Sequence, residues 1–314
     1  TIYKDGEEMG LWKAYYESGQ LAYEDTSEDL REDGVIKLYA ENGKLAAEVI
    51  TKGGEAEGLF KEYYESGQVK QEVIFKNIKA PKDTKVDESY EEYYESGKLK
   101  EEGANKNQKA DGQYRGYYES GKLKEEGVRK RGEQDGTVKT YYESGQLETE
   151  RVHKDGEIEG LYKLYFESGK LKAEIFNENG EIGTVKAYYE NGKLRKEEFY
   201  KNGKLDGVAK YYYKSGQLNF EVVHKNGIPD GLIRSYYESG QMEVERTAKN
   251  GKLDGLAKSY YESGKVENEQ VYRDGKENGS AKFYYQDGQL KSEVTYKDGK
   301  LEGLLKYYED GKLR

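Results

Sequence analysis

A glutamate recurs at one fixed place in this sequence, five residues after a glycine. Carboxylates repeated at one spacing could hold cations or supply acid–base catalysis. However, the residue six positions before the same glycines is basic in eleven of twelve cases, the exception being Glu91. The glutamates are therefore interpreted as one half of a row of ion pairs. They are Glu24, Glu48, Glu72, Glu102, Glu126, Glu150, Glu174, Glu197, Glu221, Glu245, Glu269 and Glu293.

The expected role of this row is structural. Lys163 is predicted to face Glu174, and Lys258 to face Glu269, as rungs of a ladder of opposite charges. Exposed ion pairs contribute well under about 1 kcal/mol each, so their main value is to fix the strand register. Glu91 is predicted to face a second glutamate and to weaken its own hairpin.

Other residue types capable of chemistry are few. His153 and His224 occupy one repeat position, which Tyr200 fills elsewhere, so they are interpreted as aromatic replacements and not as ligands. Segment 250–255 resembles a calcium loop, but Lys252 stands where an oxygen ligand is needed. The chain has no cysteine, which excludes disulfides and thiolate metal sites. The sequence therefore predicts no catalytic residue, no metal and no cofactor, and hence no enzyme.

Tyrosines form two further columns, as pairs shortly before the recurring glycine. The first tyrosine of the pair is present in thirteen copies and is expected to form an apolar spine of stacked rings. The second should face the other side of the sheet, which makes it the candidate contact surface. These candidates are Tyr16, Tyr64, Tyr118, Tyr142, Tyr237, Tyr261 and Tyr285.

A third column varies between copies, and its variation either tailors a contact surface or follows the changing curvature of the sheet. Its members include Trp12, Ile36, Phe60, Tyr90, Tyr114, Val138, Tyr162 and Ile233.

The element that must position these columns is a β-hairpin, seen in residues 160–176. Ser168-Gly169 is predicted to be a two-residue turn, because glycine adopts positive φ without steric cost. Counting outward pairs Phe166 with Leu171, Tyr165 with Lys172, Lys163 with Glu174 and Leu161 with Phe176.

The hairpin recurs about every 24 residues, which indicates a repeat array. Second turns of the Asn-Gly and Asp-Gly type separate the copies and favour hairpins. We therefore predict an all-β fold: an elongated, twisted antiparallel meander of about thirteen hairpins in a single-layer or solenoid-like sheet, with residues 1–314 as one array. The turn glycines are Gly19, Gly43, Gly67, Gly97, Gly121, Gly145, Gly169, Gly192, Gly216, Gly240, Gly264, Gly288 and Gly311.

One interruption, at residues 77–87, contains Pro81 and six additional residues. Proline cannot donate to a sheet ladder, so a loop is predicted here. This loop is either a surface bulge on a continuous sheet or a hinge between two stiff segments.

Charge and composition restrict the partners. The net charge is −10, and both signs are interspersed without a basic stripe, which disfavours nucleic acid and anionic lipid surfaces. The sequence contains no run of 18 apolar residues, so no membrane-spanning segment is predicted. The 33 tyrosines and the strict period argue against the disorder that the low aliphatic content suggests. Because the sequence begins with Thr1 inside a repeat, we expect that a leader was removed or the chain was shortened.

The pattern Gly-Leu-x-Lys-x-Tyr-Tyr-Glu-Ser-Gly-Lys-Leu-x-x-Glu, followed by Tyr-Lys-Asn/Asp-Gly-Lys-x-Asp/Glu-Gly, resembles the bacterial variant of the MORN repeat. It is seen whole in residues 189–213 and 296–313. The resemblance covers nearly the entire chain. It implies hairpins laid side by side, and interaction instead of catalysis. Some bacterial relatives resemble immunity partners of toxins, and others are long arrays in secreted or envelope proteins.

Two functions remain open. The first is a non-enzymatic protein-binding scaffold, either toxin-neutralising or host-directed. The second is a glycan-binding aromatic array, which is disfavoured because such arrays usually rely on tryptophan and this chain has one. The resemblance implies an extracellular or cell-envelope location, with a cytoplasmic one as the alternative. Exposed edge strands also suggest edge-to-edge self-association.

Overall fold

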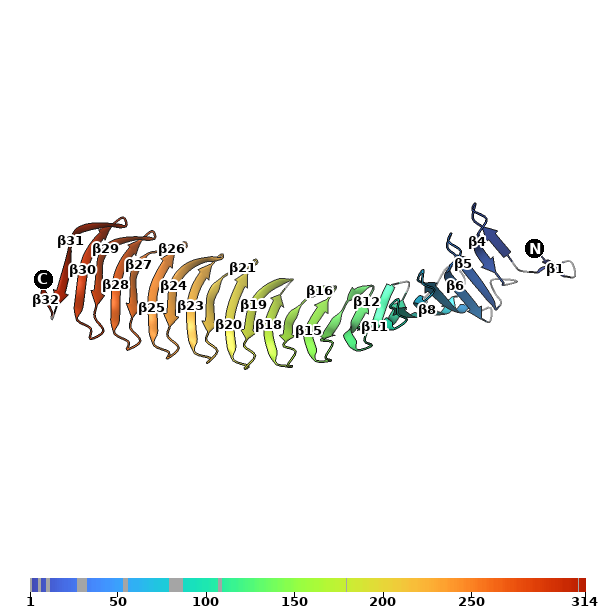
Figure 1. The fold of residues 1–314 in the computed structure, drawn as a ribbon, viewed down its shortest axis with the longest axis horizontal. Coiled ribbons are helices and arrows are strands. Elements are labelled where there is room, and N and C mark those ends of the chain that lie inside the picture. Colours follow the sequence, from blue (N-terminus) through green and yellow to red (C-terminus); the bar gives the residue numbers. More distant parts are fainter. Residues whose placement is uncertain are drawn as a thin grey trace. The chain divides into compact units, whose positions relative to one another are not determined.

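The structure is a computed structural model that describes residues 2–4, 7–9, 12–26, 33–52, 56–78, 87–106, 109–178, 180–309 and 311–314. The predicted all-β array of antiparallel hairpin repeats is confirmed (Figure 1). Within the described part of the chain, no helix is long and apolar enough to cross a membrane. The chain divides into two compact units, residues 1–158 and residues 159–314, which are described separately.

In unit 1, β1 and β2 form a separate hairpin, and β3 to β16 follow one another as antiparallel neighbours. The strands are β1 (Ile2–Lys4), β2 (Glu7–Met9), β3 (Trp12–Tyr15), β4 (Leu21–Asp25), β5 (Gly34–Tyr39), β6 (Leu45–Lys52), β7 (Ala56–Tyr63), β8 (Val69–Ile78), β9 (Asp87–Tyr93), β10 (Leu99–Lys106), β11 (Lys109–Tyr117), β12 (Leu123–Lys130), β13 (Glu133–Gln134), β14 (Gly136–Tyr141), β15 (Leu147–Lys154) and β16 (Glu157–Ile158).

Unit 2 is likewise an antiparallel meander in which each hairpin lies beside the next one in the chain. Its strands are β17 (Gly160–Tyr165), β18 (Leu171–Glu178), β19 (Glu181–Tyr188), β20 (Leu194–Lys201), β21 (Lys204–Leu205), β22 (Gly207–Tyr212), β23 (Leu218–Lys225), β24 (Ile228–Tyr236), β25 (Met242–Lys249), β26 (Lys252–Leu253), β27 (Gly255–Tyr260), β28 (Val266–Arg273), β29 (Lys276–Tyr284), β30 (Leu290–Lys297), β31 (Lys300–Glu309) and β32 (Lys312–Leu313).

The first turn of each hairpin is one residue longer than predicted. Phe166 N–H donates to the Lys170 carbonyl, and Gly169 N–H donates to the Phe166 carbonyl, each at 2.8 Å. The loop is thus a three-residue turn that ends on Gly169, whose φ is 78°. This turn twists in the sense that the strands require.

A bulge in the following strand compensates for the longer turn. Tyr165 pairs with Leu171, so the predicted pairs of Phe166 with Leu171 and of Tyr165 with Lys172 are wrong. The register shifts by one residue at Lys172. Beyond that point, Lys163 lies opposite Glu174 and Leu161 opposite Phe176, as expected.

The second turns are two-residue turns with positive φ at both positions. Asn202 has φ 51° and Gly203 has φ 69°, and the turn that they form places Lys201 opposite Lys204. Asparagine and glycine are the residues that tolerate this pair of conformations.

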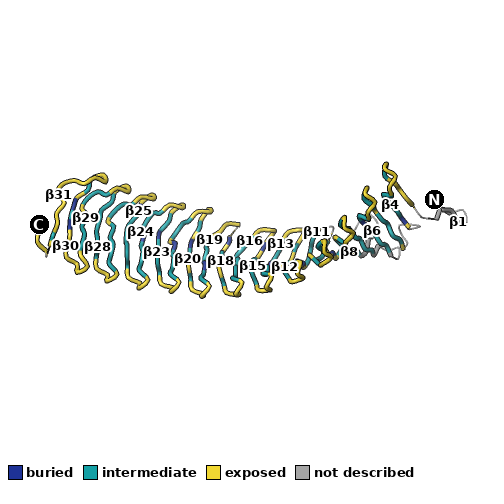
Figure 2. The backbone as a smooth tube through the Cα atoms, in the orientation of Figure 1, coloured by how far each residue is buried: buried dark blue, intermediate teal, exposed yellow. Residues whose placement is uncertain are grey.

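The buried side chains lie on one face of the sheet, which we call the packed face. It carries Tyr162 and Ile175, whereas the ladder face carries Lys163 and Glu174. In unit 2 the packed face holds a cluster of Ala209, Val222, Ile233 and Ala248, with Tyr211 and Phe220 against it. Burial is greatest within the strands, and the turns are exposed (Figure 2).

The variable column belongs to this packed face. Tyr90, Tyr114, Val138 and Ile233 are at most 9% exposed, although Trp12 is 57% exposed. The hypothesis that this column forms a contact surface is therefore wrong for its buried members. Their variation follows the space available beside each neighbour, since large side chains such as Tyr90 face Gly103 and small ones such as Ala209 face Val222.

Successive hairpins are tied together at both ends. At the second turns, the Asp206 carboxylate accepts the Asn226 backbone N–H at 3.1 Å, and the Gly227 N–H donates to the Leu205 carbonyl at 2.7 Å. Asp230 and Asn250 repeat the first of these contacts one hairpin later. Such contacts set the offset between neighbouring hairpins.

The predicted interruption lies partly outside the described residues. β8 continues through Ile78 and β9 begins at Asp87, so Asn77 and Ile78 are strand residues. Residues 79–86 fall between the described segments. The hinge stays a prediction.

Candidate functional site

The ion pairs of the charged ladder form between hairpins as well as within them. Lys258 Nζ lies 2.8 Å from Glu269, within one hairpin. Arg234 bridges two hairpins, at 2.8 Å from Glu245 and 3.5 Å from Glu221. The ladder thus connects neighbouring hairpins as well as the two strands of one hairpin. The contact between hairpins depends on their offset, which the sequence does not reveal.

The first tyrosine column supports the ladder through its hydroxyls. Tyr141 donates to Glu126 at 2.7 Å, and Tyr188 donates to Glu174 at 2.7 Å. Burial, followed by these carboxylates, raises the pKa of both tyrosines to about 12. The first tyrosines of successive hairpins are two strands apart, about 9.6 Å. This spacing exceeds the distance between stacked rings, so the expected spine of stacked rings does not follow from it.

Glu91 interrupts the alternation of charge in unit 1. It lies directly opposite Glu72 on one side and Glu102 on the other. The three carboxylates border a surface cavity of about 250 Å³, which Arg115 also lines. Among the described residues, no three histidine, cysteine, aspartate or glutamate side chains are grouped to hold a metal ion.

Glu91→Lys is expected to stabilise unit 1 by about 1 kcal/mol, because it converts two like-charge cross-strand pairs into two opposite-charge pairs. Thermal unfolding at low ionic strength is the measurement, and the gain should shrink as salt is added. Glu119→Lys, at an exposed first turn, makes the same change in net charge and serves as the control. Equal effects of the two substitutions would show that net charge, and not the ladder, is responsible.

The second tyrosine column, the predicted contact surface, has a role within the array. Among the described residues, at least eight of its hydroxyls donate to the backbone carbonyl of the first tyrosine in the next hairpin, at 2.6 to 2.9 Å. The predicted members among them are Tyr16, Tyr64, Tyr118, Tyr237 and Tyr261. Tyr142 also has an interaction, and Tyr285 is 40% exposed with Lys291 Nζ 5.6 Å from its ring centroid. The hydroxyls of these five predicted members are thus occupied, while the role of the rings as a contact surface stays a prediction.

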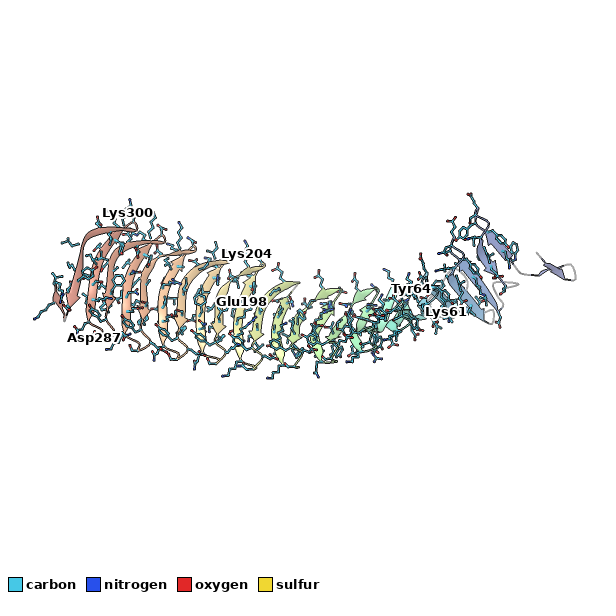
Figure 3. The ribbon with its side chains drawn as sticks, viewed as in Figure 1. Lys61, Tyr64, Glu198, Lys204, Asp287 and Lys300 are labelled. Carbon is cyan, nitrogen blue, oxygen red and sulfur yellow. The ribbon has the colours of Figure 1, made fainter. Side chains whose placement is uncertain are left out.

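Polar groups on the packed face are paired into internal networks. Glu198, labelled in Figure 3, accepts hydrogen bonds from Lys196 at 2.7 Å, Tyr211 at 2.7 Å and Tyr200 at 2.9 Å. Burial raises the pKa of Glu198, but these donors together hold it below its ordinary value. The arrangement holds a carboxylate inside the fold and is explained by packing.

The two histidines also lie on the packed face. His153 Nδ1 is 3.3 Å from the Gly156 carbonyl oxygen in unit 1, and His224 lies opposite Gly207 in unit 2. Both occupy the column that holds Tyr200, as the sequence indicated.

A feature that the sequence analysis missed is a row of exposed apolar side chains on the ladder face of unit 2. We call it the apolar stripe. Leu161 pairs with Phe176, Val208 with Val223, and Leu256 with Val271, on alternate hairpins. The hairpins between them contribute Phe199 and Leu232, each opposite a threonine. Soluble proteins seldom expose a contiguous row of this kind without a binding role. Its most exposed members, at 37–48%, are Leu161, Phe176, Phe199, Val208, Leu232 and Leu256.

The sequence feature that could have predicted the stripe is the alternation of side chains between the two faces of each strand. Leu161 and Phe176 stand two residues from the ladder pair Lys163 and Glu174, which places them on the same face. Both faces carry apolar residues, however, and the sequence does not state which face is packed.

The repeats of this chain match a known family of repeats. The pattern described as MORN repeat variant matches twelve segments, at residues 10–29, 32–52, 56–77, 89–105, 110–130, 134–155, 158–179, 181–202, 205–226, 229–250, 253–274 and 277–298. No curated protein matches the chain.

Two of the solved structures that match the chain do so at low sequence identity. "Crystal Structure of TcdB2-TccC3-TEV" is 12% identical, with a TM-score of 0.18, over 95% of this chain and 20% of that chain. The chain thus spans a fifth of that structure's length. A porin-like protein from Bacteroides uniformis ATCC 8492 is 8% identical, with a TM-score of 0.12, over 86% of this chain and 93% of that chain.

The twelve matched segments cover more than half of the 314 residues, and they coincide with the hairpins described above. The chain therefore belongs to the MORN repeat variant family.

Proposed function

We propose that this chain is a non-catalytic scaffold that binds another protein on the ladder face of its hairpins. MORN repeats generally form non-catalytic scaffolds of this kind. The observation that carries the proposal is the apolar stripe, whose six most exposed side chains are 37–48% accessible in unit 2. Burying such side chains against a partner releases about 25 cal/mol per Å² of apolar surface, which is the usual driving force of protein association.

The surroundings of the stripe favour a protein partner over a small molecule. On one side lies the ladder, whose Lys258 and Glu269 are paired with each other and need no ligand. An extended row with both apolar and charged neighbours resembles the mixed composition of protein interfaces. The glycan alternative relied on the second tyrosines, whose hydroxyls donate to the next hairpin.

The test compares the binding of wild type with that of Leu232→Glu/Leu256→Glu. Proteins captured by the wild type, from lysates of the source cell and of its host, are purified and titrated against both forms by calorimetry. We expect the double variant to bind at least about tenfold more weakly, since two apolar contacts are replaced by desolvated charges. Gln217→Glu/Gln241→Glu, at exposed first turns, makes the same change in charge away from the stripe and should bind like wild type.

Two outcomes would contradict the proposal. One is unchanged affinity of the stripe variant for every purified partner. The other is saturable binding to a glycan array that is lost in Tyr237→Phe/Tyr261→Phe and kept in the stripe variant. The origin of the partner separates the finer roles, because a toxin-neutralising scaffold binds a protein of its own cell and a host-directed scaffold binds one of the host.

A further inference from the structure

The second turns of unit 2 form an edge rich in lysine and arginine, which we call the basic edge, although the chain as a whole is acidic. The second turns place like charges directly opposite each other, as Lys201 with Lys204, Lys249 with Lys252, Arg273 with Lys276, and Lys297 with Lys300. Figure 3 shows Lys204 and Lys300 at this edge, with Asp287 at the opposite edge of unit 2. The expectation that no basic stripe exists is therefore wrong for this unit.

Folding does not require these like-charge pairs. Opposed like charges destabilise a strand pair. In unit 1 two turns hold opposite charges at the same position, with Lys130 facing Glu133 and Lys154 facing Glu157, and a third holds the like-charged Lys106 and Lys109. A sequence that keeps one basic residue opposite another in four turns of unit 2 thus retains a locally unfavourable feature, and such features point to a role other than stability.

The basic side chains at this edge are available for a ligand. All eight are exposed, and within the described residues only Lys297 makes an ion pair, with Glu302 at 3.6 Å. At the first-turn edge, by contrast, Lys265 donates to the Asp287 carbonyl at 2.8 Å.

Acidic groups near the basic edge do not cancel its charge. The half-buried Asp206 and Asp254 accept backbone N–H groups of the next turn, at 3.1 and 3.2 Å. Within the second turns that carry the basic pairs, the exposed acidic side chains are Asp274 and Asp298. The preceding second turn is acidic, because Glu178 faces Glu181 there.

The basic edge borders the apolar stripe. Val208 follows Lys204 by four residues and Leu256 follows Lys252 by four, so each of these two hairpins carries an exposed apolar group close in the chain to a basic one. In the hairpin between them, the edge itself carries the exposed Ile228. The combined surface is therefore amphipathic from the turn at Lys201 to the hairpin of Leu256.

We propose that this surface binds an acidic, amphipathic polypeptide segment, in which carboxylate side chains meet the basic edge and apolar side chains meet the stripe. This inference rests on the proposed protein-binding function and names the class of partner. Neighbouring second turns are two strands apart, about 9.6 Å. An extended segment covers that distance in three residues, at about 3.3 Å each, so an acidic residue at every third position matches the repeat.

The chemistry favours a peptide over other polyanions. Nucleic acid would use the lysines and leave the stripe in water, and the overall charge of −10 repels a polymer of high charge density. A short peptide carries few charges and experiences mainly the local field, because charges beyond about 10 Å are screened in salt.

The test uses fluorescence anisotropy of a labelled, terminally capped peptide of Glu-Leu-Ser triplets with the full chain. Binding is expected, and it should weaken several-fold as salt rises from about 50 to about 300 mM. Lys249→Glu/Lys252→Glu should weaken it at least about tenfold, whereas Lys170→Glu/Lys214→Glu, with the same change in net charge at the first-turn edge, should not. A peptide of Lys-Leu-Ser triplets should bind the Lys249→Glu/Lys252→Glu variant better than wild type, which shows that the variant is folded.

Three results would overturn the proposal. These are no binding of the acidic triplets, equal binding of a peptide with the same composition and clustered glutamates, or tighter binding of an oligonucleotide or of vesicles containing phosphatidylserine. If the acidic peptide fails while the stripe variant still loses a purified natural partner, this inference falls and the proposed function stands. If the stripe variant also keeps that partner, both fall.

Discussion

Gly103→Val is expected to destabilise unit 1 by about 3 kcal/mol, because overpacking is combined with the loss of a buried hydrogen bond. Gly103 lies opposite Tyr90 on the packed face. A Cβ atom there would come within 2.7 Å of the Tyr90 hydroxyl and 2.8 Å of its ring. Tyr90 is 6% exposed and donates to Glu101 at 2.6 Å, so its ring has no free rotamer to take. Urea unfolding, with hydrogen exchange of β9 and β10, measures the loss.

A matched glycine supplies the control. A Cβ on Gly116 would meet nothing closer than 3.8 Å, so Gly116→Ala should change stability by no more than about 0.5 kcal/mol. The double variant Tyr90→Ala/Gly103→Val should be more stable than the sum of its single changes by about 2 kcal/mol. The reason is that the chain already packs Ala209 against Val222 at the same position. Strict additivity of the two changes would contradict the packing argument.

Arg129→Met is expected to destabilise unit 1 by about 2 to 3 kcal/mol at neutral pH, because it leaves a half-buried carboxylate without its cation. Arg129 Nη1 lies 2.6 Å from Glu101 Oε1 and 2.8 Å from the Tyr90 hydroxyl, and the guanidinium stands 3.8 Å from the Tyr114 ring centroid. The side chains of Arg129 and Glu101 are 23% and 25% exposed, which is why the expected loss is below that of a fully buried pair.

The effect of Arg129→Met should depend on pH in a defined direction. Burial raises the pKa of Glu101, but hydrogen bonds from Arg129 and Tyr90 bring it below its ordinary value of 4.5. A folded-state pKa below the unfolded value gives stability that is present above pH 4.5 and is lost as pH falls through the folded pKa. In the variant, burial dominates and the pKa of Glu101 rises, so the carboxyl becomes neutral before the wild-type group does.

The difference in stability between wild type and Arg129→Met should therefore narrow on acidification. Urea unfolding at several values from neutral pH to below pH 4.5 measures it. Adding Glu101→Gln to the variant should restore part of the stability at neutral pH, since no charge is then left unpaired. A difference that stays constant across this range would show that Arg129 acts through packing against Tyr114 alone.

The hairpin unit could be predicted closely because its signals are local. Glycine at positive φ and Asn-Gly at the second turn fix where the chain reverses, as Gly169 and Asn202-Gly203 show. The pairing of Lys163 with Glu174 follows from counting outward. The first-turn geometry was missed by one residue because a three-residue turn and a bulge at Lys172 cancel each other in the count.

The candidate site was less predictable, since it depends on contacts between successive hairpins. The hydroxyl of Tyr237 donates to the Tyr260 carbonyl, a contact set by the offset between hairpins. The row of Glu72, Glu91 and Glu102 likewise needs the pairing of β8 with β9. Counting outward from a turn predicts the contacts within one hairpin but not those between neighbouring hairpins.

The sequence by itself determined the period, the turns and the charge partners within each hairpin, because these depend on backbone conformations and on alternation along a strand. Only the tertiary structure decided which face is packed. Leu161 and Tyr162 are both large side chains on one strand, yet Leu161 is the one left exposed, on the ladder face. The physical reason is that strand alternation separates two faces without ranking them, whereas burial depends on how neighbouring hairpins and their side chains close over one of them.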